Sequence, residues 1–168
     1  MESTQLAYLL LLGLVALERL FELRLSRANA AIAFSRGGVE LGRRHFGVMC
    51  ALHVGFLVAC ALEVVLLDRP FTPRIGWPML ALAVAAQGLR YWSILSLGTH
   101  WNVRVIVVPH DPVVTAGPYR WLRHPNYLAV VVEGFALPLI HGAFWTAIGF
   151  TVANALLLAL RIRVEEAA

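Results

Sequence analysis

Residues 46–67, FGVMCALHVGFLVACALEVVLL, decide the fold class of this chain. The run holds a single carboxylate, Glu63, and a single imidazole, His53, among otherwise apolar or small side chains. As an α-helix of 22 residues it would rise about 33 Å, which is enough to cross the hydrocarbon core of a bilayer. The run therefore predicts a transmembrane helix.

Working outward, four further apolar runs cover residues 6–25, 75–97, 127–140 and 143–160. The first two are also long enough to span a membrane. The run 127–140 would rise only about 20 Å and is followed by His141 and Gly142, so it is expected to turn back into 143–160 as a helical hairpin. We predict an all-α, polytopic membrane protein of about five transmembrane helices, forming one domain over residues 1–168.

Composition excludes several classes of protein. Hydrophobic residues make up 60% and charged residues 14% of the chain, and the mean hydropathy is +0.73, far from the average soluble domain. The basic residues are all arginine and are scattered through the connectors, so nucleic acid is not an expected partner, whereas anionic membrane lipid is. Cys50 and Cys60 are about three helical turns apart, which is beyond disulfide reach, and no metal-binding motif occurs.

The distribution of arginine predicts the orientation. The first connector holds Arg27, Arg36, Arg43 and Arg44, whereas the second holds Arg69 and Arg74 beside Asp68. By the positive-inside rule the first connector, residues 98–126 and the carboxyl-terminal tail face the cytoplasm, and the amino terminus lies outside.

The densest polar segment is residues 98–127, GTHWNVRVIVVPHDPVVTAGPYRWLRHPNY. Its β-branched run and its prolines predict a structured cytoplasmic loop of extended pieces. At its end Arg123, His124, Asn126 and Tyr127 gather polar groups, with Pro125 suited to the first turn of the next helix. These residues either form a polar pocket or lie at the lipid headgroups.

A second polar group, Arg161-Ile162-Arg163-Val164-Glu165-Glu166, closes the chain. Glu165 follows Arg161 by four residues and shares its helix face. This group is either a solvated helix end or, since it lies on the same membrane side as His124, the other wall of one site.

Polar residues inside the apolar runs give a third signal, because a buried charge needs a partner or water. Arg90, near the inner end of the third run with Gln87, is expected either to face the pocket or to pair with Glu133, Glu18 or Glu22. His53 and His141 are interpreted as packing or interfacial residues, and Glu63 and Asn154 complete the set.

Three separated elements, Gly117-Pro118-Tyr119, Arg123-His124-Pro125-Asn126-Tyr127 and the terminal 161–166 group after an apolar hairpin, resemble the isoprenylcysteine carboxyl methyltransferase family and its phospholipid methyltransferase relatives. The resemblance covers residues 87–168 and implies a cytoplasm-facing site for S-adenosylmethionine, whose product is S-adenosylhomocysteine. The residues that it assigns to the cofactor are Tyr119, His124, Pro125, Asn126, Tyr127, Glu165 and the backbone near Val114 and Thr115. It assigns activity to Arg123, Arg161 and Glu166, and the acceptor to Gln87, Arg90 and Trp92.

The resemblance further implies a lipophilic acceptor, either a small molecule or a prenylated terminus, that enters from the bilayer. A carboxylate acceptor needs no base and would be oriented by Arg161 or Arg123. A phenolic polyketide lipid or a phospholipid amine would have to lose a proton, with Glu166 or His124 as the base. The alternatives are a nicotinamide-dependent membrane reductase of related fold and a non-catalytic membrane scaffold; the absence of Gly-x-Gly-x-x-Gly leaves a soluble nucleotide-type site unsupported.

Overall fold

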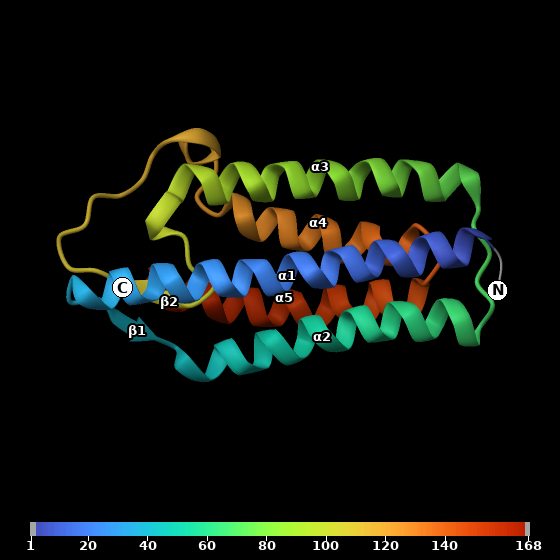
Figure 1. The fold of residues 1–168 in the computed structure, drawn as a ribbon, viewed down its shortest axis with the longest axis horizontal. Helices are drawn as coiled ribbons and strands as arrows, with labels where there is room; N and C mark the ends of the chain where they lie inside the picture. Colours follow the sequence, from blue (N-terminus) through green and yellow to red (C-terminus); the bar gives the residue numbers. More distant parts are fainter. Residues whose placement is uncertain (1–2, 167–168) are drawn as a thin grey trace.

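The computed structural model describes residues 3–166, apart from the side chains of Arg44 and His45. Five α-helices run side by side over most of this length (Figure 1). They are α1 (Ser3–Ser35), α2 (Arg43–Leu66), α3 (Pro73–Leu97), α4 (Pro125–Leu139) and α5 (Phe144–Glu166). The all-α prediction is confirmed, and so is the hairpin, since only residues 140–143 separate α4 from α5.

Three of the described helices are long and apolar enough to cross a membrane: α2 from Phe46, α3 continued to His100, and α5. Only 22–33% of their apolar windows is buried inside the protein, so most of these side chains point outward, as lipid-facing residues do. The run 6–25, predicted as a span, extends as α1 to Ser35 and is not among these three. It nevertheless lies alongside the others (Figure 1).

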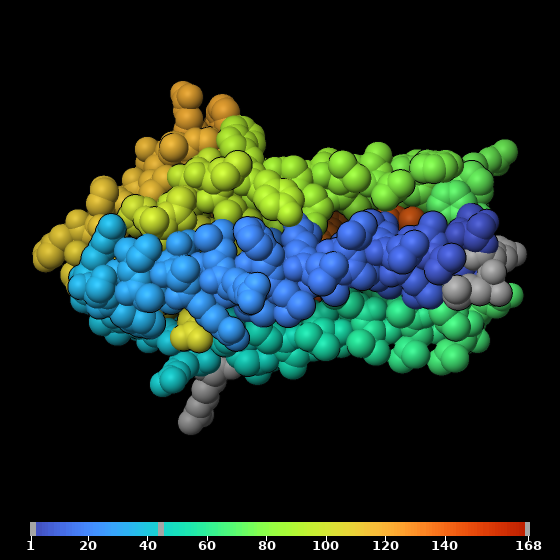
Figure 2. Space-filling view, viewed as in Figure 1, coloured from blue at the N-terminus to red at the C-terminus, as the bar shows by residue number. Residues whose placement is uncertain are grey.

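The bundle has two unlike ends. The α1–α2 connector, residues 98–124 and the carboxyl-terminal end of α5 gather at one end, which we call the loop end, and the amino terminus and the α4–α5 turn lie at the other (Figure 1). In the space-filling view the segment 98–124, coloured yellow to orange, projects from the bundle at the loop end (Figure 2). The grouping of connectors agrees with the alternation predicted from the sequence; which end faces the cytoplasm stays a prediction.

The loop is structured, as its prolines predict. It contains two 3₁₀ turns, η1 (Gly98–His100) and η2 (Gly117–Arg120), and one strand, β2 (Val105–Val107). The strand pairs antiparallel with β1 (Val39–Leu41) in the α1–α2 connector, an element that was not predicted. This two-stranded ribbon ties the loop to the amino-terminal half of the chain.

The carboxyl-terminal half of α1 holds the start of the loop by hydrogen bonds. Ser26 Oγ lies 2.7 Å from Asn102 Oδ1 and accepts from the Val103 amide at 3.1 Å. Asn29 donates to the carbonyl of Trp101 at 2.7 Å. Because all of these groups are at least partly buried, the bonds fix where the loop meets the helices.

The core lies between all five helices at the end away from the loop. It includes Tyr8, Phe56, Cys60, Leu137 and Phe150. Gly134 permits the close approach of α4 to α5, because a Cβ there would lie 2.2 Å from the Phe150 ring. Both cysteines are free.

Candidate functional site

A cavity of about 670 Å³ opens within the bundle toward the loop end, and every helix contributes to its wall. At the loop end its polar wall comes from η2, Arg123, the start of α4 and the end of α5, while α1 and α2 supply most of the apolar wall. This volume is within the roughly 300–1,000 Å³ range of small-molecule and cofactor sites. The two polar groups singled out in the sequence therefore converge on one space.

The start of α4 positions the first group. Pro125 is the first residue of that helix, as predicted, and its ring is fully buried. The ring of His124, the residue before it, stacks on Tyr127 with centroids 5.3 Å apart. The proline thus fixes the chain direction so that His124, Asn126 and Tyr127 all line the cavity.

The end of α5 supplies the second group and contacts the first. The Tyr127 hydroxyl donates to Glu165, whose carboxylate also lies 3.6 Å from the imidazole of His124. Glu166 lies 3.7 Å from Arg123 and 3.5 Å from His124. The alternative of a solvated helix end is therefore wrong for Glu165, whereas Glu166 and Arg123 are half-exposed and exposed respectively.

Arg161 is the buried cation at this end of the cavity. Only 5% of it is exposed, and its guanidinium donates to the carbonyl of Val103 at 2.9 Å and contacts the Met49 sulfur. It lies 3.6 Å from Glu165, one helical turn away, and 5.5 Å from the centroid of the Tyr127 ring. Contacts with α5, with residues 98–124 and with α2 thus fix the position of the Arg161 side chain.

Three buried polar atoms at this end have no hydrogen-bond partner among the described residues. They are Nε of Arg161, Nε1 of Trp101 and Oδ1 of Asn126, and all three residues line the cavity. Burying such groups without partners costs about 1–3 kcal/mol each. Two donors and one acceptor in the wall of the cavity are therefore unsatisfied, although neighbouring atoms cover them.

Tyr119, from η2, also lines the cavity. Burial, partly offset by a hydrogen bond with Ser93 and reinforced by the charge of Glu165, raises the pKa of the Tyr119 phenol to about 12. The phenol therefore stays protonated and can donate a hydrogen bond at any physiological pH.

Deeper in the bundle lies a second polar group, which we call the central charged cluster. It consists of Glu18, Arg19 and Glu22 of α1, Gln87 and Arg90 of α3, and Glu133 of α4. Arg90 lies 2.5 Å from Glu133 and 3.7 Å from Glu22, and Arg19 lies 2.7 Å from Glu22. The predicted ion pairing of Arg90 is confirmed, and its side chain also lines the cavity, as do Arg19 and Glu22.

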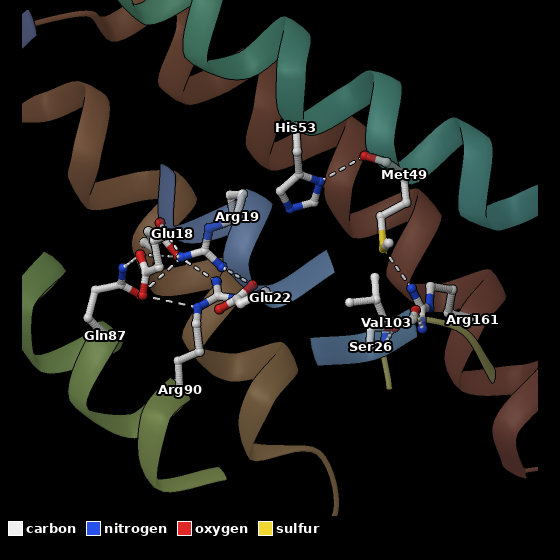
Figure 3. A network of polar contacts seen from close by, with 11 residues as sticks. Glu18, Arg19, Glu22, Ser26, Met49, His53, Gln87, Arg90, Val103 and Arg161 are labelled. Atoms are coloured by element: carbon white, nitrogen blue, oxygen red, sulfur yellow. Dashed lines mark hydrogen bonds and ion pairs between the residues drawn. The ribbon is translucent and has the colours of Figure 1, made fainter. Parts of the chain in front are cut away.

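Figure 3 shows this cluster and Arg161 at the two sides of the view, with His53 and Met49 between them. All of these residues except Glu18, Gln87 and Glu133 line the one cavity. The cavity thus has a polar end near the loop, a charged end inside the bundle and apolar side chains along its length, among them Leu57, Val58 and Leu157.

Other predicted site residues lie outside this lining. Gln87 belongs to the central charged cluster, and Trp92 packs against Trp121 with ring centroids 5.9 Å apart. Val114 and Thr115 lie in the loop between β2 and η2 and do not line the cavity. Their predicted contacts with acceptor or cofactor stay predictions.

Arg19, His53 and Trp101 are among the cavity residues that the sequence alone did not identify as part of a site. Arg19 and Trp101 were not singled out, and His53 was interpreted as a packing residue. His53 does pack edge-on against Phe150, with centroids 5.4 Å apart, and it also lines the cavity. Arg19 could have been found as a charge inside an apolar run, as Arg90 was.

Comparisons with known proteins identify a family and two relatives of this chain. The model of the isoprenylcysteine carboxyl methyltransferase (ICMT) family matches residues 79–168, which include α4, α5 and the whole loop between α3 and α4. The uncharacterized protein YpbQ of Bacillus subtilis is 34% identical over 160 residues, covering 95% of this chain and 94% of that protein. An uncharacterized protein of Haemophilus influenzae is 28% identical over 153 residues, covering 89% and 87% respectively. The family match over more than half of the chain, together with a bundle of apolar helices, shows that the chain belongs to the ICMT family of membrane methyltransferases.

Proposed function

We propose that this chain is an S-adenosylmethionine-dependent methyltransferase that acts on a lipophilic acceptor resident in the membrane. The observation that carries the proposal is the convergence of the 123–127 motif and the end of α5 on one cavity, where three buried polar atoms lack partners. Family membership supports the reaction class.

The residues at the loop end of the cavity suit the cofactor. When bound, S-adenosylmethionine supplies an electrophilic methyl group on a positively charged sulfur. The Glu165 carboxylate offers the negative charge that a sulfonium or ammonium group requires, and the positive charge of Arg161 in the cavity wall suits a carboxylate. Tyr127 and Trp101 provide aromatic surface, and Trp101 adds an unpartnered donor.

The rest of the cavity suits an apolar acceptor. Leu20 of α1 and Val54 and Val58 of α2 line it and are themselves more than half exposed. A lipid chain can thus contact the cavity wall without leaving an apolar environment. Positioning the acceptor beside the methyl group and excluding water are the main contributions of the protein to such a displacement.

We also infer that the loop end faces the cytoplasm, with the amino terminus outside and the carboxyl terminus inside. The α1–α2 connector, which holds Arg36 directly after α1, lies at the same end as the last turn of α5, and this supports the orientation (Figure 1). Single cysteines placed at residue 37 and at residue 142, in a variant without Cys50 and Cys60, would be labelled by an impermeant maleimide from opposite sides of the membrane.

Ligand-induced thermal stabilisation tests the cofactor. S-adenosylhomocysteine is expected to raise the melting temperature of the detergent-purified protein, because a ligand that binds only the folded state stabilises it by mass action, whereas NADPH is expected to have no effect. Stabilisation by NADPH alone would favour the reductase instead. Glu165→Gln should weaken this stabilisation, while Glu40→Gln, which alters a carboxylate outside the cavity, should retain it.

Transfer itself is tested with radiolabelled cofactor and a lipid extract of the host organism. The expected result is a labelled product in the organic phase, identified by mass spectrometry. Absence of both transfer and stabilisation would remove the methyltransferase proposal and leave the scaffold.

A further inference from the structure

His53 of α2 lies in the wall of the cavity. Its imidazole lines the same cavity as Arg161 and Glu165, and in Figure 3 the ring extends from α2 into the space between Arg161 and the central charged cluster. The edge-on contact with Phe150 holds the ring plane. A histidine in this position is placed beside any molecule that fills the middle of the cavity.

A hydrogen bond assigns the tautomer of this ring. Nδ1 of His53 lies 2.9 Å from the carbonyl oxygen of Met49. A carbonyl only accepts hydrogen bonds, so the proton of the neutral ring is on Nδ1 and the lone pair is on Nε2. Among the described residues Nε2 has no hydrogen-bond partner. The ring therefore presents a fixed base to the cavity.

Charged groups of both signs share a cavity with His53. They are Arg19 and Glu22 of α1, Arg90 of α3, Arg123 before α4, Glu133 of α4, and Arg161 and Glu165 of α5; the other titratable groups in the wall are Cys50, Tyr119, His124 and Tyr127. Arg19, Arg90 and Arg161 each lie beside a carboxylate. An imidazolium formed during turnover would thus have carboxylates in the same cavity to stabilise it.

The other two candidate bases, His124 and Glu166, already contact charged side chains. Both nitrogens of His124 face carboxylates, Glu165 at 3.6 Å and Glu166 at 3.5 Å. Glu166 pairs with Arg123 and does not line the cavity.

We propose that His53 is a catalytic residue whose Nε2 removes the proton from the methyl-accepting atom, and hence that the acceptor is a protic lipid with an O–H or N–H group and not a carboxylate. The proposal rests on the methyltransferase function proposed above. As the acceptor atom bonds to the methyl carbon, its proton passes to Nε2. The S–CH₃ bond breaks and its electron pair stays on sulfur, so one positive charge moves from the sulfonium to the imidazole.

The wild-type protein alone tests the substrate class. The labelled lipid product is treated with mild alkali, which hydrolyses a methyl ester to volatile methanol but leaves a methyl ether or a methylamine intact. Label that stays in the lipid phase is the expected result. Label released as methanol would identify a carboxylate acceptor and overturn the proposal while leaving the methyltransferase function intact.

Substitution tests the residue. His53→Gln keeps a hydrogen-bonding side chain of similar size without its basicity, and it should lower kcat by about 10²- to 10⁴-fold. The thermal shift produced by S-adenosylhomocysteine should remain, and the fall in rate at acid pH, caused by protonation of His53, should disappear. His141→Gln is the matched control, because His141 likewise has Nδ1 on a backbone carbonyl, that of Arg69 at 2.8 Å, but lies outside the cavity.

A turnover of His53→Gln within about threefold of wild type, with the acidic limb unchanged, would contradict the proposal. A readout independent of activity is the nitrogen NMR spectrum of protein labelled at histidine. It should contain a neutral Nδ1–H ring whose signals are absent from His53→Gln and shift when S-adenosylhomocysteine binds. A resting Nε2–H tautomer at this position would also contradict the proposal.

Discussion

Replacing Glu63 should loosen the helical hairpin that carries the end of α5 to the cavity. This side chain extends from α2 to the first turn of α5, where its carboxylate accepts from the amides of Trp145 and Thr146 at 3.2 and 2.7 Å. It also accepts from the Thr146 hydroxyl at 2.8 Å and from Arg69 at 3.0 Å. The first amides of a helix have no partner within the helix, so Glu63 caps α5 from another element.

The magnitude follows from these four bonds. In Glu63→Ala four donors lose their acceptor: two backbone amides, a hydroxyl and a guanidinium. At about 1 kcal/mol or more for each donor, we expect the free energy of unfolding to fall by about 4 kcal/mol. For a chain of this size that corresponds to a fall in melting temperature of roughly 8–16 °C. Glu63→Gln retains one acceptor oxygen and should lose about half as much.

Thermal unfolding in detergent, followed by tryptophan fluorescence, measures both variants. Glu40→Ala serves as control, because within the described part of the chain this carboxylate pairs with Arg104 alone, at 3.4 Å, and such a partly exposed pair is worth under about 1 kcal/mol. If Glu63→Ala melted within about 3 °C of wild type, or if the Gln and Ala variants melted together, the cap would not contribute as described.

Three further predictions concern the loop end. Gly117→Ala should destabilise the loop by about 1–3 kcal/mol and increase proteolytic cleavage there, because Gly117 has φ of 57° and an added Cβ would lie 2.0 Å from Ser96 Oγ; unchanged protection would argue against this close contact. Arg161→Lys should lower turnover at least about tenfold, since an ammonium cannot reproduce the planar fork that reaches the Val103 carbonyl, and undiminished turnover would exclude Arg161 from substrate positioning. At about pH 10, where an exposed tyrosine is half ionised, Tyr119→Phe should show the same phenolate absorbance as wild type, because the raised pKa keeps Tyr119 protonated; a lower absorbance of the variant would contradict the shift.

Local sequence signals predicted much of the fold. The long apolar runs predicted the helices, Pro125 predicted the start of α4, and His141 with Gly142 predicted the turn between α4 and α5. The distribution of arginine predicted that Tyr127 and Glu165 lie on the same side of the membrane. In the structure the two side chains are hydrogen-bonded.

The remaining parts depend on contacts between distant segments, which no local pattern encodes. The pairing of β1 with β2 joins residues separated by more than sixty positions, and three-residue strands are too short to give a periodic signal. Arg19 and His53 each sit in an apolar run where the sequence alone allows several facing partners. Only the packing of α1 and α2 against the other helices shows that both side chains reach the cavity.

The division of the cavity wall between the two halves of the chain has a consequence for how such proteins diversify. The family model matches from residue 79 onward and so covers the polar loop end, whereas α1 and α2, which supply Leu20, Val54 and most of the apolar wall, precede it. Substitutions in these two helices can reshape the apolar part of the cavity without touching Tyr127 or Glu165. One polar end can therefore be combined with apolar spaces of different shape, and under the proposed function α1 and α2 would set which acceptor fits.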